Sequence, residues 1–367
     1  MKVAIVHDYL REYGGAERVV ETLHEIFPDA PVYTAYFNPK GLGPHAARIK
    51  KWDIKTSWIQ NLPWANKLIS PFRIFAPMAF ESFDLSKYDV VISSCAIYFA
   101  KAVITKPTTL HISYIHTPPR YLYGFTTSFN YKRNPITNLL GEFANHFLRI
   151  YDFETSQRPD ILIANSKNVQ ERIKKFYRRD SVIIYPPVDV DQFKSRGKKG
   201  EEYFLSVGRL VRGKGIDIIV EACTRLGVPL KVVGAGPQLE ELKKKASKNV
   251  EFLGQVKDED MAEIYHNAKA TIVASEDEDF GIVPVESMAS GTPVIAIKAG
   301  GFLETVIDGK TGSFYEKATA EYLVEVLKNF DSKKFKEEDC VKQAEKFSKE
   351  RFKKEILELI DKNKIKD

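Results

Sequence analysis

The sequence has few cysteines and no long apolar run. Its three cysteines, Cys95, Cys223 and Cys340, are far apart, and none stands in a CxxC or Cys/His spacing. This pattern argues against a disulfide framework and a zinc site, and it fits a reducing compartment. The apolar run before His7 is too short for a signal peptide, and no apolar run of about 18 residues follows. We therefore expect a cytoplasmic chain that does not span a membrane.

Low-complexity tracts and internal repeats are also missing, which argues against a disordered or solenoid protein. The chain has 367 residues, of which 44% are hydrophobic and 28% charged. This length exceeds what one hydrophobic core usually serves, so two domains are expected.

The positive charge lies in the amino-terminal half. Residues 1–190 hold 24 Lys and Arg against 17 Asp and Glu, a formal charge of +7, whereas residues 191–367 hold 31 against 32, or −1. In the stretch 101–150 the only acid is Glu142, against six bases: Lys101, Lys106, Arg120, Lys132, Arg133 and Arg149. Two interpretations are open, a basic face that meets anionic lipid or a phosphorylated acceptor and an ordinary solvated surface.

An aromatic stretch between Trp58 and Phe80 offers the same choice. It contains five large aromatic residues and two bases, which could dock on membrane or acceptor lipid or could form cap and core: Trp58, Trp64, Phe72, Phe75, Phe80, Lys67 and Arg73.

Buried-strand patterns alternate with helical patterns along the chain. Residues 3–6, 88–94, 110–116 and 160–166 are typical of buried strands, and 167–177 of a helix. After the charged segment 194–202 the alternation restarts at 203–210. Such alternation predicts two Rossmann-like α/β domains with parallel sheets, over 1–193 and 194–347. An amphipathic helix at about 348–367, with Phe352, Ile356, Leu357 and Ile360 on one side, is expected to pack back on the first domain.

Two glycine-rich segments imitate nucleotide-binding motifs. Residues 208–214 match GxxxxGK, but Gly215 stands where a P-loop needs Ser or Thr for magnesium, so an NTPase is disfavoured. Arg209 and Lys214 still follow a strand and precede a helix, where two cations suit a diphosphate. Gly234 and Gly236 begin like GxGxxG, but Leu239 replaces the third glycine; a tight turn explains them equally well.

The segment 278–301 is the strongest local signal. Glu278 and Glu286 are separated by seven residues, with Phe280 and Gly281 between them, and Glu286 is expected about two turns into a helix. Amides at a helix N-terminus attract anions, and carboxylates accept hydrogen bonds from sugar hydroxyls. An acidic loop and a surface helix residue are the alternative interpretation.

This pattern resembles glycosyltransferase family 4, the retaining GT-B enzymes, whose two Rossmann-like domains face each other across a cleft. The resemblance covers nearly the whole chain and includes VGRLVRGKGIDIIVEA (207–222), in which Arg209 and Lys214 match the residues that grip the donor diphosphate. It implies that Glu286 holds the donor ribose and Glu278 the sugar hydroxyls. It further implies a catalytic-site role for His116, from YIHTPPRYLY (114–123).

The same resemblance implies further donor contacts. It assigns a phosphate-binding loop to Gly14 and Gly15. It assigns backbone amides toward sugar and phosphate to Phe280, Gly281, Ile282 and Val283. It assigns a nucleobase wall to Gly234, Gly236, Pro237, Leu253 and Val256. His7 and Asp8 are weaker candidates for the same cleft, and His7 could equally be packed and silent.

The opening VHDYLREYGGAERVVETL, together with YIHTPPRYLY, resembles mannosyltransferases of polysaccharide and O-antigen assembly, which makes GDP-mannose the first donor expected. A UDP- or ADP-sugar-dependent hexosyltransferase, an epimerase- or phosphorylase-like relative and a silent binding scaffold are the alternatives. The expected acceptor is a glycan or a lipid-linked molecule. The chain is expected to meet it as a peripheral protein at the inner face of the plasma membrane. The DVD at 189–191 and DED at 258–260 are interpreted as structural rather than metal-binding. No cofactor, metal or nucleic acid is expected.

Overall fold

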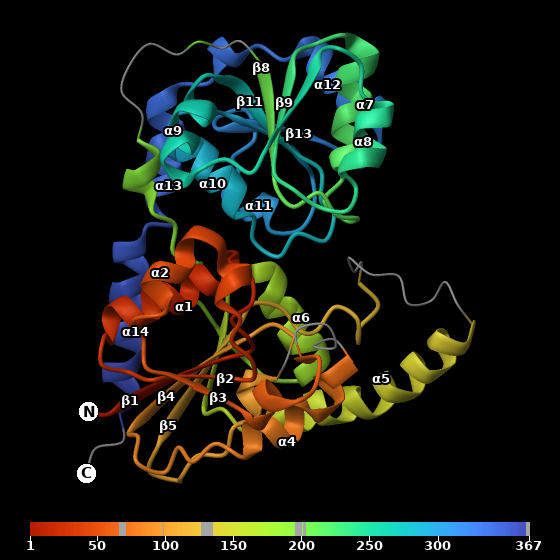
Figure 1. The fold of residues 1–367 in the computed structure, drawn as a ribbon. Coiled ribbons are helices and arrows are strands. Elements are labelled where there is room, and N and C mark those ends of the chain that lie inside the picture. Colours follow the sequence, from red (N-terminus) through yellow and green to blue (C-terminus); the bar gives the residue numbers. More distant parts are fainter. Residues whose placement is uncertain (66–70, 98, 126–134, 195–199, 201–202, 365–367) are drawn as a thin grey trace. The chain divides into compact units, whose positions relative to one another are not determined.

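The computed structural model describes residues 1–65, 71–97, 99–125, 135–194, 200 and 203–364 (Figure 1). They form two compact units. The N-terminal unit comprises the described residues from Met1 to Pro187 and those from Phe352 onward, and the C-terminal unit comprises those of Val188–Arg351. The division precedes the one predicted after residue 193. The reason is that η6 (Val190–Phe193) packs into the C-terminal unit, where Ser290 Oγ donates a 2.8 Å hydrogen bond to the Phe193 carbonyl.

The N-terminal unit contains a seven-stranded parallel sheet in the order β3-β2-β1-β4-β5-β6-β7. Its long strands are buried on both faces, as the apolar runs predict, whereas β2, β3 and β7 have only two or three residues. The strands are β1 (Val3–His7), β2 (Val32–Thr34), β3 (Ile54–Thr56), β4 (Val90–Cys95), β5 (Leu110–Ile115), β6 (Ile161–Ala164) and β7 (Val182–Ile183).

Helices cover both faces of this sheet (Figure 1). Because successive strand residues point to opposite faces, Ile5 packs with α1 (Gly15–Ile26) and α14 (Lys349–Asn363), and Val6 belongs to the cluster of α4 (Ala76–Glu81), α5 (Pro135–Thr155) and α6 (Lys167–Tyr177). From α14, Phe352, Ile356 and Ile360 are buried in the core. Leu357, which the sequence placed beside them, is 41% exposed because the buried stripe is narrower than predicted. The short helical segments are η1 (Pro39–His45), α2 (Ala46–Ile49), η2 (Trp58–Asn61), η3 (Pro71–Phe75) and η4 (Ala100–Ala102).

The C-terminal unit contains a six-stranded parallel sheet in the order β10-β9-β8-β11-β12-β13. In Figure 1, α7, α8 and α12 flank it on one side, and α9, α10 and α13 on the other. The predicted fold class, two Rossmann-like units with parallel sheets, is confirmed. The elements are β8 (Tyr203–Val207), α7 (Ile216–Leu226), β9 (Leu230–Val233), α8 (Leu239–Lys245), β10 (Val250–Gly254), α9 (Asp258–His266), β11 (Ala268–Val273), α10 (Ile282–Ala289), β12 (Val294–Ile297), α11 (Phe302–Thr305), β13 (Gly312–Tyr315), α12 (Ala320–Asn329), η7 (Ser332–Lys334) and α13 (Glu337–Glu345).

The structure shows that one residue of the predicted basic stretch and one of the predicted aromatic stretch are buried. Lys101, counted in the basic stretch, is fully buried in an ion pair with Asp152, so it belongs to the core. Phe80 is also fully buried, whereas Trp58 and Phe75 are 37% and 41% exposed. Lys67, Lys132 and Arg133 lie outside the described residues.

Candidate functional site

Several sequence-predicted residues, including Lys214 and Glu278, follow the strands at which their sheet reverses its order. In the C-terminal unit the chain runs from β8 to β9 and β10 on one side, then returns to β11 on the other side of β8. In the N-terminal unit the same reversal lies between β1 and β4. Ligands of open α/β sheets bind beyond the carboxyl ends of the strands at such a switch point. Each unit therefore brings its candidate residues to the edge where chemistry is expected.

Lys214 and Glu278 meet at the switch point of the C-terminal unit. Lys214 follows β8 and Glu278 follows β11, so neighbouring strands bring together residues 64 positions apart. The Lys214 ammonium nitrogen lies 2.7 Å from Glu278 Oε2, and both side chains are partly exposed. Arg209, on the same loop as Lys214, is exposed. The two cations and the carboxylate thus stand on adjacent loops of one unit.

The backbone around Glu278 is held by two glycines that the sequence interpretation left unexplained. The Gly301 amide donates a 2.9 Å hydrogen bond to the Glu278 carbonyl. Gly300 has φ of +55°, and a Cβ there would lie 2.4 Å from the same carbonyl oxygen. A side chain at either position would push the loop away, so Gly300 and Gly301 fix where Glu278 stands.

Glu286 is buried and receives a hydrogen bond from a tyrosine. It is the fifth residue of α10, less than the two turns expected, because the helix begins at Ile282 directly after Gly281. The Tyr265 hydroxyl on α9 donates to Glu286 Oε2 at 2.8 Å, and Glu286 is only 5% exposed. Sequence reasoning missed Tyr265, because nothing in its local pattern separates it from an ordinary core tyrosine. The surface-residue alternative for Glu286 is thereby wrong.

Residues 280–283 offer backbone rather than side-chain groups. Gly281 has φ of +92° and precedes the first turn of α10, where a Cβ would lie 2.8 Å from the Phe302 ring. The Phe280 ring is buried against Phe347, with centroids 5.3 Å apart. Ile282 and Val283 form the first turn of α10, whose amides have no partner within the helix. A contact of Phe280 with a ligand would therefore use its main chain.

The loops after β8, β9 and β10 lie close together through backbone hydrogen bonds. The Leu210 amide donates to the Ala235 carbonyl at 2.9 Å, and the Gly234 amide donates to the Gly254 carbonyl at 2.7 Å. A Cβ on Gly236 would lie 2.3 Å from the Leu210 carbonyl oxygen, so close approach of two loops explains this glycine. The remaining predicted wall residues stand at the same strand ends, with Pro237 exposed and Leu253 and Val256 half-buried.

A chain of polar side chains lies at the switch point of the N-terminal unit. His116 Nε2 lies 2.8 Å from Ser94 Oγ, and His7 Nδ1 lies 3.1 Å from both the hydroxyl and the carbonyl oxygen of Ser94. His7 Nε2 lies 3.5 Å from Glu17 Oε1. His7, Ser94 and His116 come from the ends of β1, β4 and β5, which are adjacent in the sheet. Sequence reasoning named His116, treated His7 as a weak candidate and missed Ser94.

Glu17 links this chain to the predicted phosphate loop. Its other oxygen, Oε2, accepts a 2.9 Å hydrogen bond from the Gly14 amide, which closes a capping box at the start of α1. Gly15 is the first residue of that helix. The Gly14 backbone is extended, and a Cβ there would meet only Glu17 Oε2 at an ordinary 3.5 Å. Neither conformation nor packing within the described unit therefore requires glycine at position 14.

The two histidines have opposite pKa shifts. Burial, reinforced by the positive charge of His7, lowers the pKa of His116 to about 3, so this ring is neutral. Burial also opposes protonation of His7, but the hydrogen bond and charge of Glu17, with help from Asp8, raise its pKa above the ordinary value. The surroundings therefore favour protonation of His7 and disfavour protonation of His116, on either side of Ser94.

Asp8 has a structural role. It is buried, and its carboxylate accepts hydrogen bonds from three backbone amides after β4, including those of Ala96 at 2.7 Å and Ala100 at 2.9 Å. These contacts hold the loop that follows Ser94, so Asp8 supports the site instead of facing a ligand.

The acidic motifs lie at helix starts, as their interpretation as structural residues requires. Asp189 caps η6 through the Gln192 amide and lies 3.4 Å from the Lys349 ammonium, and Asp258 begins α9. Within the part of the chain that the structure describes, no three His, Cys, Asp or Glu side chains gather as a metal site would need.

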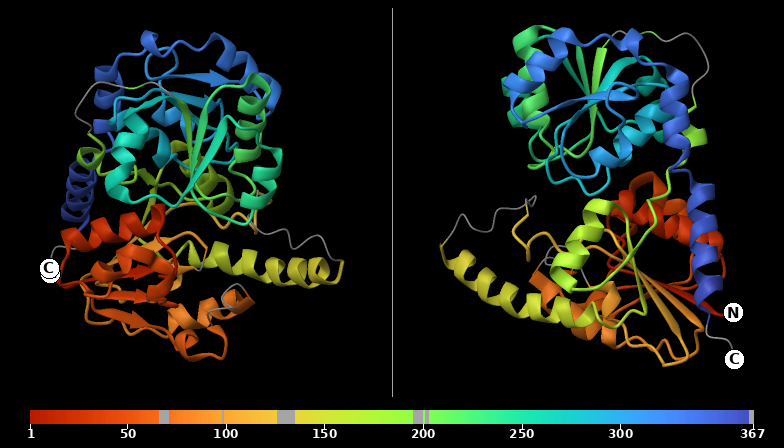
Figure 2. Two further views of the ribbon diagram at one scale, coloured as in Figure 1. Left: turned by 45° about the horizontal axis from the view of Figure 1, so that its top comes forward. Right: turned by 180° about the vertical axis from the view of Figure 1, so that it is seen from behind.

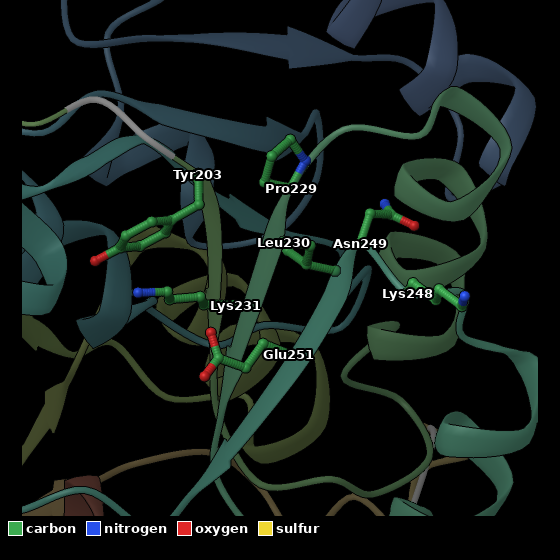
Figure 3. A pocket seen from close by; sticks show the side chains of 7 residues that line it. All are labelled: Tyr203, Pro229, Leu230, Lys231, Lys248, Asn249 and Glu251. Carbon is green, nitrogen blue, oxygen red and sulfur yellow. The ribbon is translucent and has the colours of Figure 1, made fainter.

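A shallow depression of about 320 Å³ lies elsewhere in the C-terminal unit (Figure 3). Tyr203 begins β8 and Leu230 begins β9, so the depression sits at the amino ends of the strands, opposite the edge that carries Lys214 and Glu278. The Lys231 ammonium lies 4.0 Å from the centre of the Tyr203 ring. None of the sequence-predicted residues lines this depression.

Helix α5 has an exposed apolar stripe, which sequence reasoning also missed. Leu139, Phe143, Phe147 and Ile150 are 73%, 67%, 55% and 52% exposed and recur at helical spacing. Figure 2 shows the first part of α5 projecting beyond the sheet of its unit. In the described parts of the chain, no helix combines the length and apolarity needed to cross a bilayer.

Comparison with known families gives two matches. Residues 13–192 match the family described as Glycosyltransferase Family 4, and residues 188–347 match Glycosyl transferases group 1. An uncharacterized glycosyltransferase of Methanocaldococcus jannaschii is 30% identical over 200 residues, 52% of this chain and 56% of that protein. The D-inositol 3-phosphate glycosyltransferase of Corynebacterium urealyticum is 27% identical over 248 residues, 58% of each chain. The chain thus spans roughly half the length of the curated relatives it matches.

Solved structures share the fold over the whole chain. Alr3699/HepE of Anabaena, in complex with UDP and glucose, has a TM-score of 0.72 at 18% identity and covers 98% of this chain and 99% of its own. Sucrose-phosphate synthase of Thermosynechococcus elongatus has a TM-score of 0.74 at 19% identity, with 99% of each chain covered. At these identities the likeness shows the fold alone.

Proposed function

We propose that this chain, which matches Glycosyltransferase Family 4 over residues 13–192 and Glycosyl transferases group 1 over residues 188–347, transfers a hexosyl group from a sugar nucleotide to a glycan or lipid-linked acceptor. The contact between Lys214 and Glu278 carries this proposal. A cation of the kind that suits a diphosphate lies there next to a carboxylate that can accept hydrogen bonds from sugar hydroxyls, at the switch point where open α/β sheets bind ligands.

The proposed chemistry uses charge and positioning. Arg209, Lys214 and the amides that begin α10 neutralise the departing diphosphate, while Glu278 and Glu286 accept hydrogen bonds from sugar and ribose hydroxyls. The acceptor hydroxyl attacks from the face that the diphosphate leaves, so the configuration at the sugar carbon is retained, and the leaving phosphate accepts the proton. These cations and amides supply the charge stabilisation without a metal ion. His116 acts beside the transferred sugar, and Gly14 and Gly15 act on the donor phosphates.

GDP-mannose is the proposed donor, in the assembly of a cell-surface polysaccharide or glycolipid. The resemblance of VHDYLREYGGAERVVETL to mannosyltransferases supports it. A UDP-sugar is the second candidate, because a structural neighbour was solved with UDP and glucose.

A donor screen tests the function. The purified chain is incubated with GDP-, UDP- and ADP-sugars, with and without a crude lipid-linked acceptor fraction, and the nucleoside diphosphate released is measured. Acceptor-dependent release from GDP-mannose is expected, and an α-configured product seen by NMR would show retention. If the donor is consumed without any acceptor and no nucleoside diphosphate is released, an epimerase-like relative would be favoured. No turnover of any donor by the folded chain would contradict the proposal.

We further propose that the N-terminal unit contacts anionic membrane through the apolar stripe of α5. The exposure of Phe143 and Phe147 supports this contact. Co-sedimentation with vesicles containing anionic lipid should fall in a Phe143→Ser, Phe147→Ser double variant and should not change in Leu357→Ser, which alters an exposed leucine on α14. Equal sedimentation of the double variant and the wild-type chain would contradict the proposal.

A further inference from the structure

The polar chain around Ser94 determines which ring nitrogen of each histidine carries a proton. The Ser94 carbonyl oxygen can only accept a hydrogen bond, so His7 Nδ1, 3.1 Å away, must carry hydrogen and donate. The Ser94 hydroxyl oxygen lies at the same distance from this donor and accepts from it as well. The hydroxyl hydrogen of Ser94 is then directed to His116 Nε2, 2.8 Å away.

Glu17 interacts with the other ring nitrogen of His7. Its carboxylate lies 3.5 Å from His7 Nε2, where a lone pair would be repelled and an N–H is attracted. His7 is therefore a cation with both nitrogens protonated, which agrees with the raised pKa of its ring. The charged groups facing His7 are Glu17 and Asp8, which favour the cation, and the neutral His116 lies beyond Ser94.

We propose that Ser94, His7 and Glu17 are positioning residues that hold His116 in the neutral tautomer with hydrogen on Nδ1. In this tautomer Nε2 is occupied by the Ser94 hydroxyl, so His116 presents an N–H donor and cannot act as a base through Nε2. Among the described residues, no hydrogen bond is made by His116 Nδ1. Its N–H can therefore donate to an oxygen of a bound substrate. This inference rests on the proposed function, in which His116 acts beside the transferred sugar.

Nitrogen NMR of the full chain labelled with ¹⁵N-histidine tests the tautomer without any substrate. Long-range correlations at neutral pH should show hydrogen on Nδ1 and not on Nε2 of His116, and hydrogen on both nitrogens of His7. The signals are assigned by their loss in His116→Gln and His7→Gln. Hydrogen on Nε2 of His116 in the wild-type chain would overturn the inference.

Variants at Ser94 test whether the tautomer matters for transfer. Ser94→Ala should shift His116 toward the Nε2–H form and lower kcat about tenfold, with nucleotide affinity unchanged. Ser94→Thr keeps the hydroxyl, so it should have the wild-type tautomer of His116 and the wild-type kcat. Ser93→Ala is the matched control, because Ser93 makes an equivalent buried bond of 2.9 Å to His111 from the neighbouring position of β4. It should leave the His116 tautomer and kcat unchanged.

Two outcomes separate this inference from the proposed function. A wild-type kcat in folded Ser94→Ala, with the tautomer shifted, would overturn the positioning role. An unchanged transfer rate in His116→Gln would instead contradict the role of His116 in the proposed function, and the tautomer measured in the ligand-free chain would stand. If Ser94→Ala fails to fold, Glu17→Gln provides the second variant, in which His7 should lose its second proton.

Discussion

The ammonium nitrogen of Lys214 lies 2.7 Å from Oε2 of Glu278, across two adjacent loops of the C-terminal unit. Each side chain thus balances the charge of the other where a diphosphate and a sugar are proposed to bind. A diphosphate that binds Lys214 must compete with Glu278 for the ammonium.

Replacement of Lys214 by alanine should reduce catalysis far more than stability. Removal of one group that stabilises the departing charge typically lowers kcat by about 10²–10³-fold. The pair is partly exposed, so its loss should change the free energy of unfolding by less than about 1 kcal/mol. Donor kinetics and urea unfolding measure the two effects. Lys298→Ala is the matched control, since Lys298 forms a 2.7 Å surface pair with Glu316 in the same unit, and it should leave kcat unchanged.

Tyr265→Phe should weaken donor binding through Glu286. The tyrosine hydroxyl is a buried hydrogen-bond donor to that carboxylate, and such a bond to a charged group contributes about 1.5–3 kcal/mol. Without it, Glu286 loses its orientation, and we expect about a tenfold rise in the dissociation constant of the nucleotide. In the control, Tyr203→Phe removes a hydroxyl that donates to a carbonyl of the same helix, α9. Equal nucleotide affinities of the two variants would rule out the orienting role.

The long buried strands made much of the fold predictable. Because β8 is mostly apolar, the sequence placed Arg209 and Lys214 directly after a strand, and a parallel sheet brings strand ends together. Strands such as β2 and β3, with three residues each, are too short to show a period of two and were not predicted.

Contacts between distant residues were not predictable in the same way. The Ser94 hydroxyl lies beside His7, 87 positions away, and a serine within a strand carries no signal of such a partner. Lys101 gave a misleading signal, because charge in a sequence normally indicates a surface and only the fold reveals Asp152 beside it.

The pair of His7 and Glu17 should stabilise the fold more at low pH than at high pH. The pKa of His7 is raised in the folded chain, so its contribution is fully present below about pH 6.5 and is lost as the pH rises through the raised value. Glu17→Gln keeps an oxygen for the Gly14 amide but removes the charge. Its melting temperature should therefore fall further below the wild-type value at about pH 6 than at about pH 9. A deficit that grows with pH would contradict the cationic state of His7.

Lys101→Ala should destabilise the N-terminal unit strongly. It leaves the Asp152 carboxylate fully buried without its cation, although the Tyr123 and Tyr177 hydroxyls still donate to it. Breaking such a pair typically costs about 3–5 kcal/mol. Urea unfolding should show this loss, and Lys106→Ala, which changes an exposed lysine of the same stretch, should cost less than about 0.5 kcal/mol. Similar costs for both variants would contradict the burial of Lys101.

Calorimetric titration of the purified chain with GDP, UDP and ADP tests the proposed donor site most directly. We predict that the wild-type chain binds at least one of these nucleotides, with GDP the tightest, and that the double variant Arg209→Ala, Lys214→Ala loses this binding while remaining folded. Binding of equal strength in the double variant, or no binding of any of the three by the wild-type chain, would contradict the account.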